Sequence, residues 1–123
     1  VTAHPDLLIV LRDSGNGCAL RSGSHALGQA LLNRNSRMGS TAYVNYNCIE
    51  DLAGVLGVEP AGLLGHVMAH ELAHLLGLPH ADRGLMRAQW DDTELALASQ
   101  GLLNFSTEQS EHMRRGIAVL TNQ

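Results

Sequence analysis

The segment at residues 70–80 reads HELAHLLGLPH and contains the residue types that bind and use a metal ion. On a helix, His70 and His74 lie one turn apart and point the same way, so both imidazoles can reach one ion. Gly77 then permits a left-handed turn that ends the helix and brings His80 back towards the same point. Three neutral nitrogen ligands leave a fourth position for water, as a catalytic zinc ion requires. We therefore expect one catalytic Zn²⁺ ion held by His70, His74 and His80.

Glu71 directly follows the first of these histidines and would reach a water molecule on the metal without binding the metal itself. Bound zinc lowers the pKa of such a water to around 7. Glu71 would accept its proton as general base, and the hydroxide would attack a carbonyl carbon that the zinc also polarises. In a chain of this composition the motif's five fixed positions arise by chance on the order of 1 in 10,000 times, against roughly 1 in 50 for His-Glu-x-x-His alone. The added Gly77 and His80 therefore make a chance occurrence of the zinc-binding motif far less frequent than that of His-Glu-x-x-His alone.

One long helix is predicted to carry the first part of this motif, over residues 60–76. Pro60 suits the first helical position, because its missing N–H costs nothing there. Gly77 is a natural end, since glycine readily adopts the left-handed conformation that closes many helices. Apolar residues recur along the segment at helical spacing, namely Leu63, Leu64, Val67, Leu72, Leu75 and Leu76.

The other predicted elements are shorter. The apolar run at residues 7–11 is typical of a buried strand, and the alternation over residues 41–47 predicts a second strand. We predict further helices at residues 26–32, at residues 50–58, and from Ser106 or Thr107 to about Leu120. The last of these would begin with a capping box.

Length and composition narrow the class of protein. At 123 residues the chain fits one small domain with one core. A hydrophobic share of 45% and a charged share of 16% are typical of a globular protein. The formal charge of −4 leaves no basic patch for nucleic acid, and no apolar run approaches the roughly 18 residues of a membrane span. Cys18 and Cys48 are compatible with one disulfide outside the cytoplasm and equally with two buried thiols.

The motif resembles that of the metzincin clan of zinc endopeptidases, and HELAHLLGLPH is most similar to the matrix metalloproteinase branch. Members of this clan carry a methionine beneath the zinc in a segment called the Met-turn, and Gly84-Leu85-Met86 matches it. The resemblance therefore implies that Met86 lies under the metal, with an ordinary core methionine as the alternative. The short separation of His80 from Met86 implies a tight intervening loop.

The resemblance also implies a fold. We expect an α+β, zincin-like catalytic domain with a small twisted mixed sheet, an active-site helix, the Met-turn and a C-terminal helix. Residues 1–123 would form this one domain, with an upper subdomain over about 1–77 and a lower subdomain over about 78–123. Residues 5–11 resemble the sheet strand that precedes the active-site helix, and residues 105–120 resemble the C-terminal helix.

Metzincins lay an extended substrate against an edge strand, and residues 39–47 resemble that region. The resemblance implies that substrate contacts fall on Ser40, Thr41, Ala42 and Tyr43, up to Val44. An ordinary exposed edge strand is the alternative. Trp90 is a candidate for lining the specificity pocket, although a lone tryptophan is at least as often a packing residue.

Several positions depart from the best-known branches. No tyrosine follows Met86, so the additional tyrosine ligand of astacin-like and serralysin-like members has no counterpart. Ala81 follows the third histidine, where matrix metalloproteinases usually have Ser or Thr and adamalysins have Asp. Nothing in the chain resembles the cysteine-switch pro-segment. The protein is therefore expected to be a compact, divergent member.

Other candidate residues are set aside. His66 precedes His70 by one turn, but a fourth histidine on the helix would close the site and leave His80 without a role. The remaining histidines are expected at the surface or partly buried: His4, His25 and His112. An acidic cluster matches no calcium loop and is expected to form a solvated helix start, so calcium is not indicated: Asp91, Asp92 and Glu94.

The leading hypothesis is a zinc-dependent endopeptidase that hydrolyses extended peptide or protein substrates. The competing hypothesis is a catalytically silent, metal-stabilised binding module of the same fold, and the intact Glu71 argues against it. A third interpretation is an intracellular peptidase or a domain of a longer chain. It differs in compartment or chain length, while the zinc-dependent hydrolysis is the same. We expect the protein to be secreted or extracytoplasmic and assume a monomer.

Overall fold

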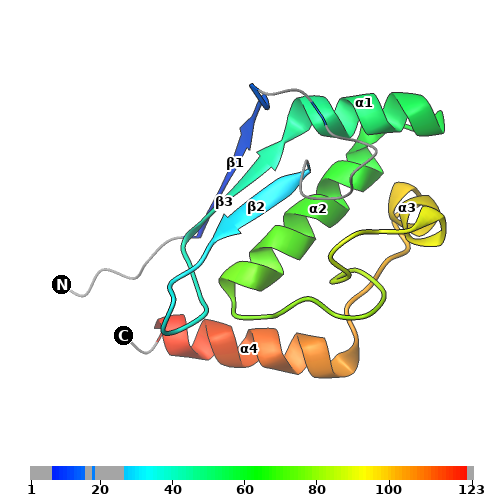
Figure 1. Ribbon diagram of the computed structural model, residues 1–123. Helices are drawn as coiled ribbons and strands as arrows, with labels where there is room; N and C mark the ends of the chain where they lie inside the picture. The colour runs from blue at the N-terminus through cyan, green and yellow to red at the C-terminus, as the bar shows by residue number, and fades with distance from the viewer. Residues whose placement is uncertain (1–6, 16–17, 19–26, 122–123) are drawn as a thin grey trace.

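The structure of the protein, a computed structural model, describes residues 7–15, 18 and 27–121. Within those residues the chain forms a three-stranded sheet and four helices, which confirms the α+β class (Figure 1). The elements are, in order, β1 Leu8–Arg12, β2 Gly28–Leu31, β3 Thr41–Asn45, α1 Tyr46–Leu56, α2 Pro60–Leu75, α3 Asp92–Ser99 and α4 Thr107–Thr121. None of these helices has the length and apolar character that a membrane crossing requires.

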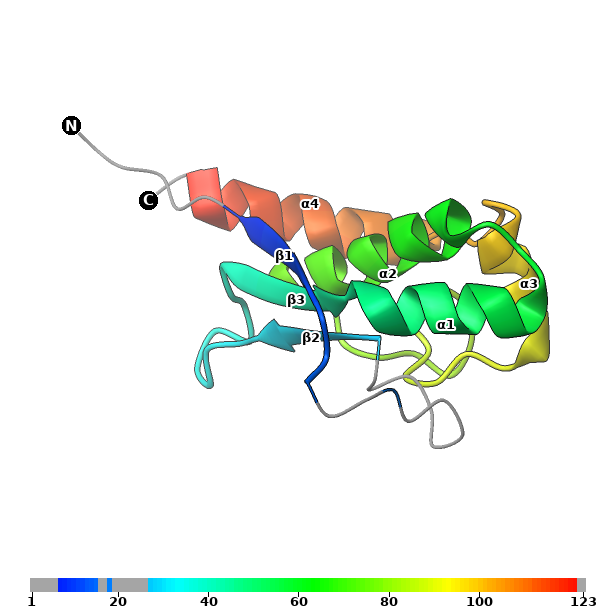
Figure 2. The same cartoon turned by 90° about the horizontal axis from the view of Figure 1, so that it is seen from above.

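The sheet is mixed and has β3 at its centre. β1 runs parallel to β3, with Leu8 opposite Thr41, and β2 runs antiparallel to it, with Gly28 opposite Val44. Seen from above, α2 passes along the sheet beside β3 and β2 (Figure 2), and it contacts both strands. Val44 is fully buried, because alternate side chains of a strand point to the same face and this face is covered by helices.

The main core lies between the sheet, α1 and α2. Val44 from β3, Ile49 from α1, and Leu63 and Val67 from α2 belong to one buried cluster. The chain has only one Phe, one Trp and two Tyr, so aliphatic side chains supply most of this core. Fully burying each such side chain contributes about 1.5–3 kcal/mol. This packing holds α2, the helix that carries the histidine motif, against the sheet.

Cys18 and Cys48 form a disulfide, with their Cα atoms 5.3 Å apart. The bond ties the segment between β1 and β2 to α1, where Cys48 is fully buried. With a sequence separation of 30 residues, the cross-link is expected to stabilise the fold by about 3–4 kcal/mol, mainly by restricting the unfolded chain. Of the two states that the sequence leaves open for these cysteines, the structure has the disulfide.

The prediction of a helix over residues 26–32 is wrong. Gly28–Leu31 is strand β2, while Ala26 lies outside the described residues. Leucine, alanine and glutamine favour a helix when only local preference is considered. Pairing with β3 overrides that weak preference, because it gives the backbone of this short segment hydrogen-bond partners that the sequence does not reveal.

The prediction that residues 39–47 lie at the edge of the sheet is also wrong. β3 is paired on both sides, and β2 is the edge strand next to α2. This order cannot be inferred when β2 itself is taken for a helix. The strand also ends earlier than predicted, since Tyr46 begins α1, four residues before Glu50.

The predicted ends of the two long helices agree closely with the structure. α2 begins at Pro60 as predicted and ends at Leu75, with Leu76 as its C-cap. α4 begins at Thr107, directly after Ser106. The Oγ atom of Ser106 accepts a hydrogen bond from the Gln109 N–H at 3.1 Å, and the Ser106 N–H donates to Gln109 Oε1 at 2.8 Å, so the capping box is confirmed.

Candidate metal centre

Two backbone hydrogen bonds turn the chain back after α2. Gly77 adopts a φ of 94°, in the left-handed region that favours glycine. Its N–H donates to the His74 carbonyl at 2.9 Å, and the Leu78 N–H donates to the Ala73 carbonyl at 3.0 Å. This is a Schellman-type helix ending. It reverses the chain within a few residues and confirms the predicted turn that brings His80 towards the helix.

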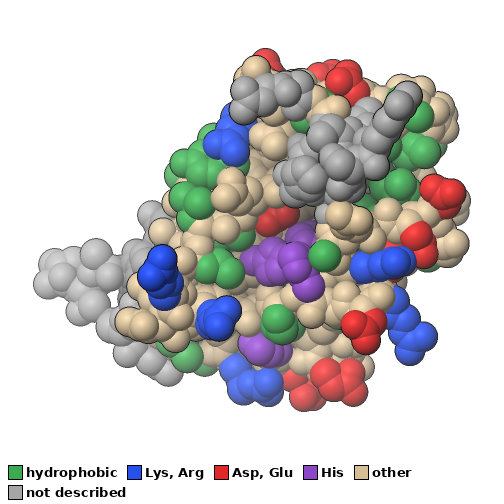
Figure 3. All heavy atoms as spheres, viewed as in Figure 1, with side chains coloured by type: hydrophobic (Ala, Val, Ile, Leu, Met, Phe, Trp, Pro, Cys, Tyr) green, Lys and Arg blue, Asp and Glu red, His purple; other side chains and the backbone are tan. Residues whose placement is uncertain are grey.

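The three imidazole rings of His70, His74 and His80 converge, and we call them the three-histidine cluster. His74 Nε2 lies 3.1 Å from His70 Nε2 and 3.1 Å from His80 Nε2, and the three ligand atoms all lie within 4.8 Å of one another. His70 is buried, His74 is half-buried and His80 is exposed. Figure 3 shows histidine side chains gathered in a hollow at the centre of one face of the molecule.

Backbone carbonyls determine the tautomers of the two helical histidines. His70 Nδ1–H donates to the Leu85 carbonyl at 2.7 Å, and His74 Nδ1–H donates to the Leu78 carbonyl at 2.8 Å. Because a carbonyl oxygen only accepts, each Nδ1 carries the proton and each neutral Nε2 presents a lone pair. Two such lone pairs facing each other at 3.1 Å repel unless a cation lies between them. Metal-binding histidines have this same arrangement of one donating and one ligating nitrogen.

The donor set fits a single transition-metal ion. Imidazole nitrogens bind Zn²⁺ at about 2.0–2.1 Å, so two of them on one tetrahedral ion lie roughly 3.3 Å apart. The two 3.1 Å separations around His74 are close to this value. His80, exposed and beyond the end of α2, is the third candidate ligand. Imidazole suits zinc, copper, iron and nickel.

Burial favours the neutral form of the two helical histidines. It lowers the pKa of His70 to about 4, against a smaller opposite effect of the Leu85 carbonyl. It also lowers the pKa of His74 below its ordinary value. Neutral imidazole is the form that binds a metal, so protons compete little with an ion for these two nitrogens at neutral pH.

Glu71 lies beside the three-histidine cluster with its carboxylate against β2. The residue is buried, with 6% of its surface exposed. A Cβ atom on Gly28 would lie 2.8 Å from Glu71 Oε2, so the absence of a side chain at that position leaves room for the carboxylate. Burial raises the pKa of Glu71 to about 7. A carboxyl group with such a pKa can both accept and release a proton near neutral pH.

The loop after the third histidine is as tight as its length implies. The Ala81 N–H donates to the Met86 carbonyl at 2.9 Å, and residues 81 and 87 form a bridge. Met86 is fully buried and packs with Ala73 and Leu78 in a second apolar cluster. Leu85, the residue before Met86, supplies the carbonyl that His70 contacts. The loop therefore reaches the three-histidine cluster through its backbone.

A cavity of about 750 Å³ opens over the three-histidine cluster and Glu71. Residues 28–30 of β2, residues 87–90 and His112 of α4 line it, and a Cβ atom on Gly77 would lie 3.5 Å from His112 Nε2. Trp90 lines the cavity, and its ring centroid lies 6.1 Å from that of His70. It also packs against the main core, and its role in a specificity pocket stays a prediction.

Apart from Trp90, the residues proposed from the sequence to contact substrate do not line this cavity. Ala42 is fully buried, and Thr41 and Tyr43 belong to the central strand, where the backbone is already paired on both sides. Ser40 lies just before that strand. The physical reason for the discrepancy is the strand order, which places β2 between β3 and the cavity.

Sequence reasoning missed several residues that the structure brings to the cavity. The sequence predicts a helix for the β2 residues and a surface or partly buried position for His112. His112 is half-buried and lines the cavity. No local signal marks these positions, since each reaches the cavity only through the packing of its own element. The residues in question are Gly28, Gln29, Ala30, Arg37 and His112.

His66 is not part of the three-histidine cluster, as predicted. Its Nδ1 lies 2.7 Å from the Gly62 carbonyl oxygen and its Nε2 lies 3.2 Å from the Leu103 carbonyl oxygen. It therefore connects α2 to the segment before α4. His4 and His25 lie outside the described residues.

The acidic cluster before α3 is a helix start, as predicted. Asp91 is the N-cap of α3, and it forms a capping box with Glu94. Arg87 pairs with both carboxylates, at 2.8 Å from Asp91 and 3.2 Å from Glu94. The expectation of a solvated cluster is wrong for Glu94, which is 6% exposed.

Comparison of the chain with models of known protein families, with curated proteins and with solved structures finds no match. The assignment of the centre therefore depends on the positions of its own residues.

Proposed function

We propose that the protein is a zinc-dependent endopeptidase of metzincin type, with the three-histidine cluster as its metal centre. The observation that supports this proposal most strongly is the meeting of three imidazole Nε2 atoms and one buried carboxylate in a single cavity. A structural metal site has no use for a carboxylate that stands beside the ligands without joining them. Glu71 is such a carboxylate.

Zinc bound to these ligands would acidify a water molecule and polarise a carbonyl group. Glu71 would accept the proton of that water and deliver it to the leaving amine, since burial raises the pKa of its carboxyl to about 7. The carbonyls of Leu85 and Leu78 hold His70 and His74 by Nδ1, which leaves the Nε2 atoms to bind the ion. Met86, buried next to Leu85, takes the place of the Met-turn methionine.

An extended peptide would bind along the outer edge of β2. Within the described part of the chain this strand pairs with β3 alone, so its other edge is open to a further strand. Backbone pairing of this kind holds a substrate with little regard to sequence, while side-chain pockets supply preference. Residues 28–30 line the cavity, and Trp90 stands near His70, where a substrate side chain would enter. A peptide laid along β2 would pass the metal in mid-chain, which favours internal cleavage.

We also propose that the protein works outside the cytoplasm. The Cys18–Cys48 disulfide supports this location, because such bonds persist in oxidising compartments and are rare in the cytosol.

The experiment compares wild type with Glu71→Gln, using zinc-loaded proteins and a broad library of quenched peptides. We expect about one zinc per chain in both proteins and a loss of cleavage of at least about 100-fold in the variant. Glu108→Gln, which changes an exposed glutamate at the start of α4, serves as the control and should cleave like wild type. Equal cleavage by wild type and Glu71→Gln would contradict the proposed mechanism. Bound zinc without cleavage of any peptide would identify the protein as a metal-stabilised binding module instead.

A further inference from the structure

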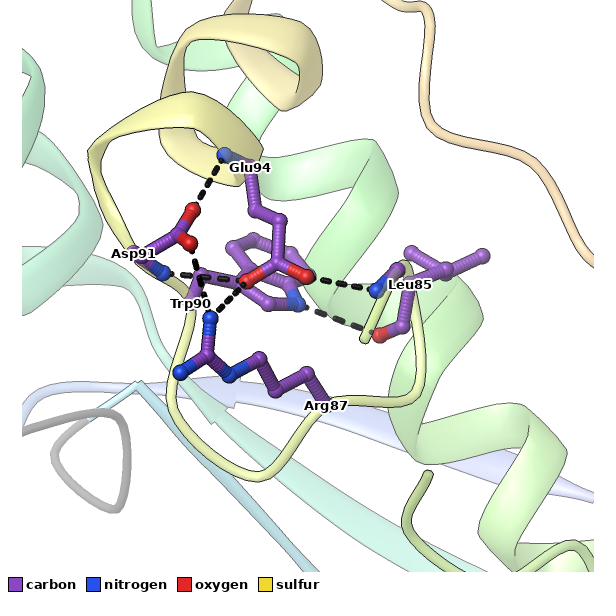
Figure 4. A network of polar contacts seen from close by, with 6 residues as sticks. Leu85, Arg87, Trp90, Asp91 and Glu94 are labelled. Carbon is purple, nitrogen blue, oxygen red and sulfur yellow. Dashed lines mark hydrogen bonds and ion pairs between the residues drawn. The ribbon is translucent and has the colours of Figure 1, made fainter. Parts of the chain in front are cut away.

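Glu94 is a buried carboxylate that does not line the cavity. It lies in the first turn of α3, and its side chain leaves that helix to enter the loop after the three-histidine cluster (Figure 4). Burying a carboxylate is costly unless hydrogen bonds compensate for its lost hydration. Both oxygens of Glu94 have such partners, so the position of this side chain is closely determined.

The two carboxylate oxygens of Glu94 contact different parts of the structure. Oε1 accepts from the Asp91 N–H at 3.0 Å and from Arg87 Nη1 at 3.2 Å, on the side of the helix start. Oε2 accepts from the N–H of Gly84, on the side of the loop. The contact with Gly84 is part-buried and charge-assisted, and hydrogen bonds to a charged group are among the stronger ones in proteins.

Gly84 lies one residue before the carbonyl that orients His70. It adopts a φ of 81°, a left-handed conformation that glycine supplies without strain, and the following Leu85 carbonyl points to α2. That carbonyl accepts from His70 Nδ1–H at 2.7 Å and from Trp90 Nε1–H at 3.1 Å. Figure 4 shows Glu94 and Trp90 reaching the same short stretch of backbone at Leu85. A continuous chain of contacts therefore runs from Glu94 through the loop to a candidate metal ligand.

We propose that Glu94 is a positioning residue for the metal centre: by holding the Gly84 N–H it fixes the Leu85 carbonyl, which fixes the tautomer and ring orientation of His70. The inference rests on the proposed metal centre and not on peptidase activity. Removing a partner that orients a metal-binding histidine lowers the metal affinity by about 10- to 100-fold. Glu94 acts one contact further out, so the lower end of that range is expected.

The test uses Glu94→Gln, with Asp91→Asn as its matched control. A glutamine retains one carbonyl oxygen, which the two donors Asp91 N–H and Arg87 Nη1 attract, so its amide nitrogen would face the Gly84 N–H. The variant therefore loses the contact with the loop while the capping contact remains. Asp91→Asn removes the same charge from the same helix start, but the side chain of Asp91 contacts only Arg87 and the Glu94 N–H among these groups. Asparagine also caps helices as well as aspartate does.

Two quantities are measured in each protein. The first is the zinc dissociation constant, from competition with a chromophoric chelator. We expect Glu94→Gln to weaken zinc binding by about 10-fold and Asp91→Asn to stay within about twofold of wild type, since an exposed ion pair contributes little. The second is the ¹⁵N chemical shift of the His70 ring in the metal-free protein. We expect the Nδ1–H tautomer in wild type and Asp91→Asn, and a mixture of tautomers in Glu94→Gln.

Equal zinc affinity and an unchanged His70 tautomer in Glu94→Gln would overturn the proposal while leaving the metal centre standing. An equal loss of zinc affinity in Glu94→Gln and Asp91→Asn would also overturn the proposal. The loss would then come from the helix start of α3 and not from the contact with Gly84. A wild-type protein that binds no zinc would overturn the metal centre and this inference together. If Glu94→Gln does not fold, Trp90→Phe replaces it, since it removes the indole donor to the Leu85 carbonyl, together with one ring of the side chain, and should weaken zinc binding in the same direction. Unchanged zinc affinity in that variant would then decide against the proposal.

Discussion

The carboxylate of Glu71 lies against the backbone of Gly28, between α2 and the edge strand of the sheet. A Cβ atom on residue 28 would lie 2.8 Å from Glu71 Oε2 and 3.1 Å from the carbonyl oxygen of Tyr43. The missing side chain at this position therefore provides the space that the carboxylate occupies. A sheet residue with no functional group of its own thus determines where the proposed general base can lie.

Gly28→Ala should impair catalysis without removing the metal. The added methyl group displaces the Glu71 carboxylate, and a misplacement of about 1 Å can lower the rate about 100-fold. We expect kcat/KM for peptide cleavage to fall by that order while the zinc content stays at about one per chain. Gly54→Ala in α1 is the control, because a Cβ atom there meets nothing within 4 Å. Wild-type kcat/KM in Gly28→Ala would show that Glu71 does not depend on this space.

His80→Ala and His66→Ala should separate the proposed ligands from the other histidine of α2. Removing one of three ligands leaves two nitrogens, so we expect the zinc dissociation constant of His80→Ala to rise by at least about 100-fold. His66 contacts the Gly62 and Leu103 carbonyls and lies outside the three-histidine cluster, so His66→Ala should bind zinc like wild type. Chelator competition on both proteins checks this. Tight zinc binding by His80→Ala, or loss of zinc binding in His66→Ala, would show that the proposed assignment of the ligands is wrong.

The start of α3 should make stability depend on pH. The hydrogen bond from the Glu94 N–H holds the pKa of Asp91 below its ordinary value of 3.8, and Arg87 adds to this effect. A carboxyl whose pKa is lower in the folded state stabilises the fold above its unfolded pKa, and that contribution is lost as the pH falls through the folded pKa. Wild type should therefore resist urea better than Asp91→Asn at neutral pH, and the difference should vanish in acid below the folded pKa. A difference that is the same at both pH values would contradict this.

The histidine motif and its helix could be predicted because their signals are local. Pro60 marks the first turn, Gly77 marks the end, and the spacing of His70 and His74 places both on one side of any helix. The direction in which the chain returns after Gly77 follows from the conformation of glycine alone. These features need no knowledge of the rest of the chain.

The surroundings of the motif could not be predicted, because they arise from contacts between distant segments. β2 has the local composition of a helix and becomes a strand only by pairing with β3. The contact of Glu94 with Gly84 joins α3 to the preceding loop, and neither residue signals the other in sequence. The sequence does not show that Gly28 leaves room for the Glu71 carboxylate, because this role depends on the position of β2 beside α2.

The most direct test of the central claim is a zinc titration of the metal-free protein, with cleavage of a quenched-peptide mixture followed at each step. The cleavage rate should rise in proportion to added zinc and stop rising at one equivalent per chain, and His80→Ala should give no such rise. Cleavage that does not depend on zinc would contradict the proposed function. So would a wild-type protein that takes up one equivalent of zinc and cleaves no peptide.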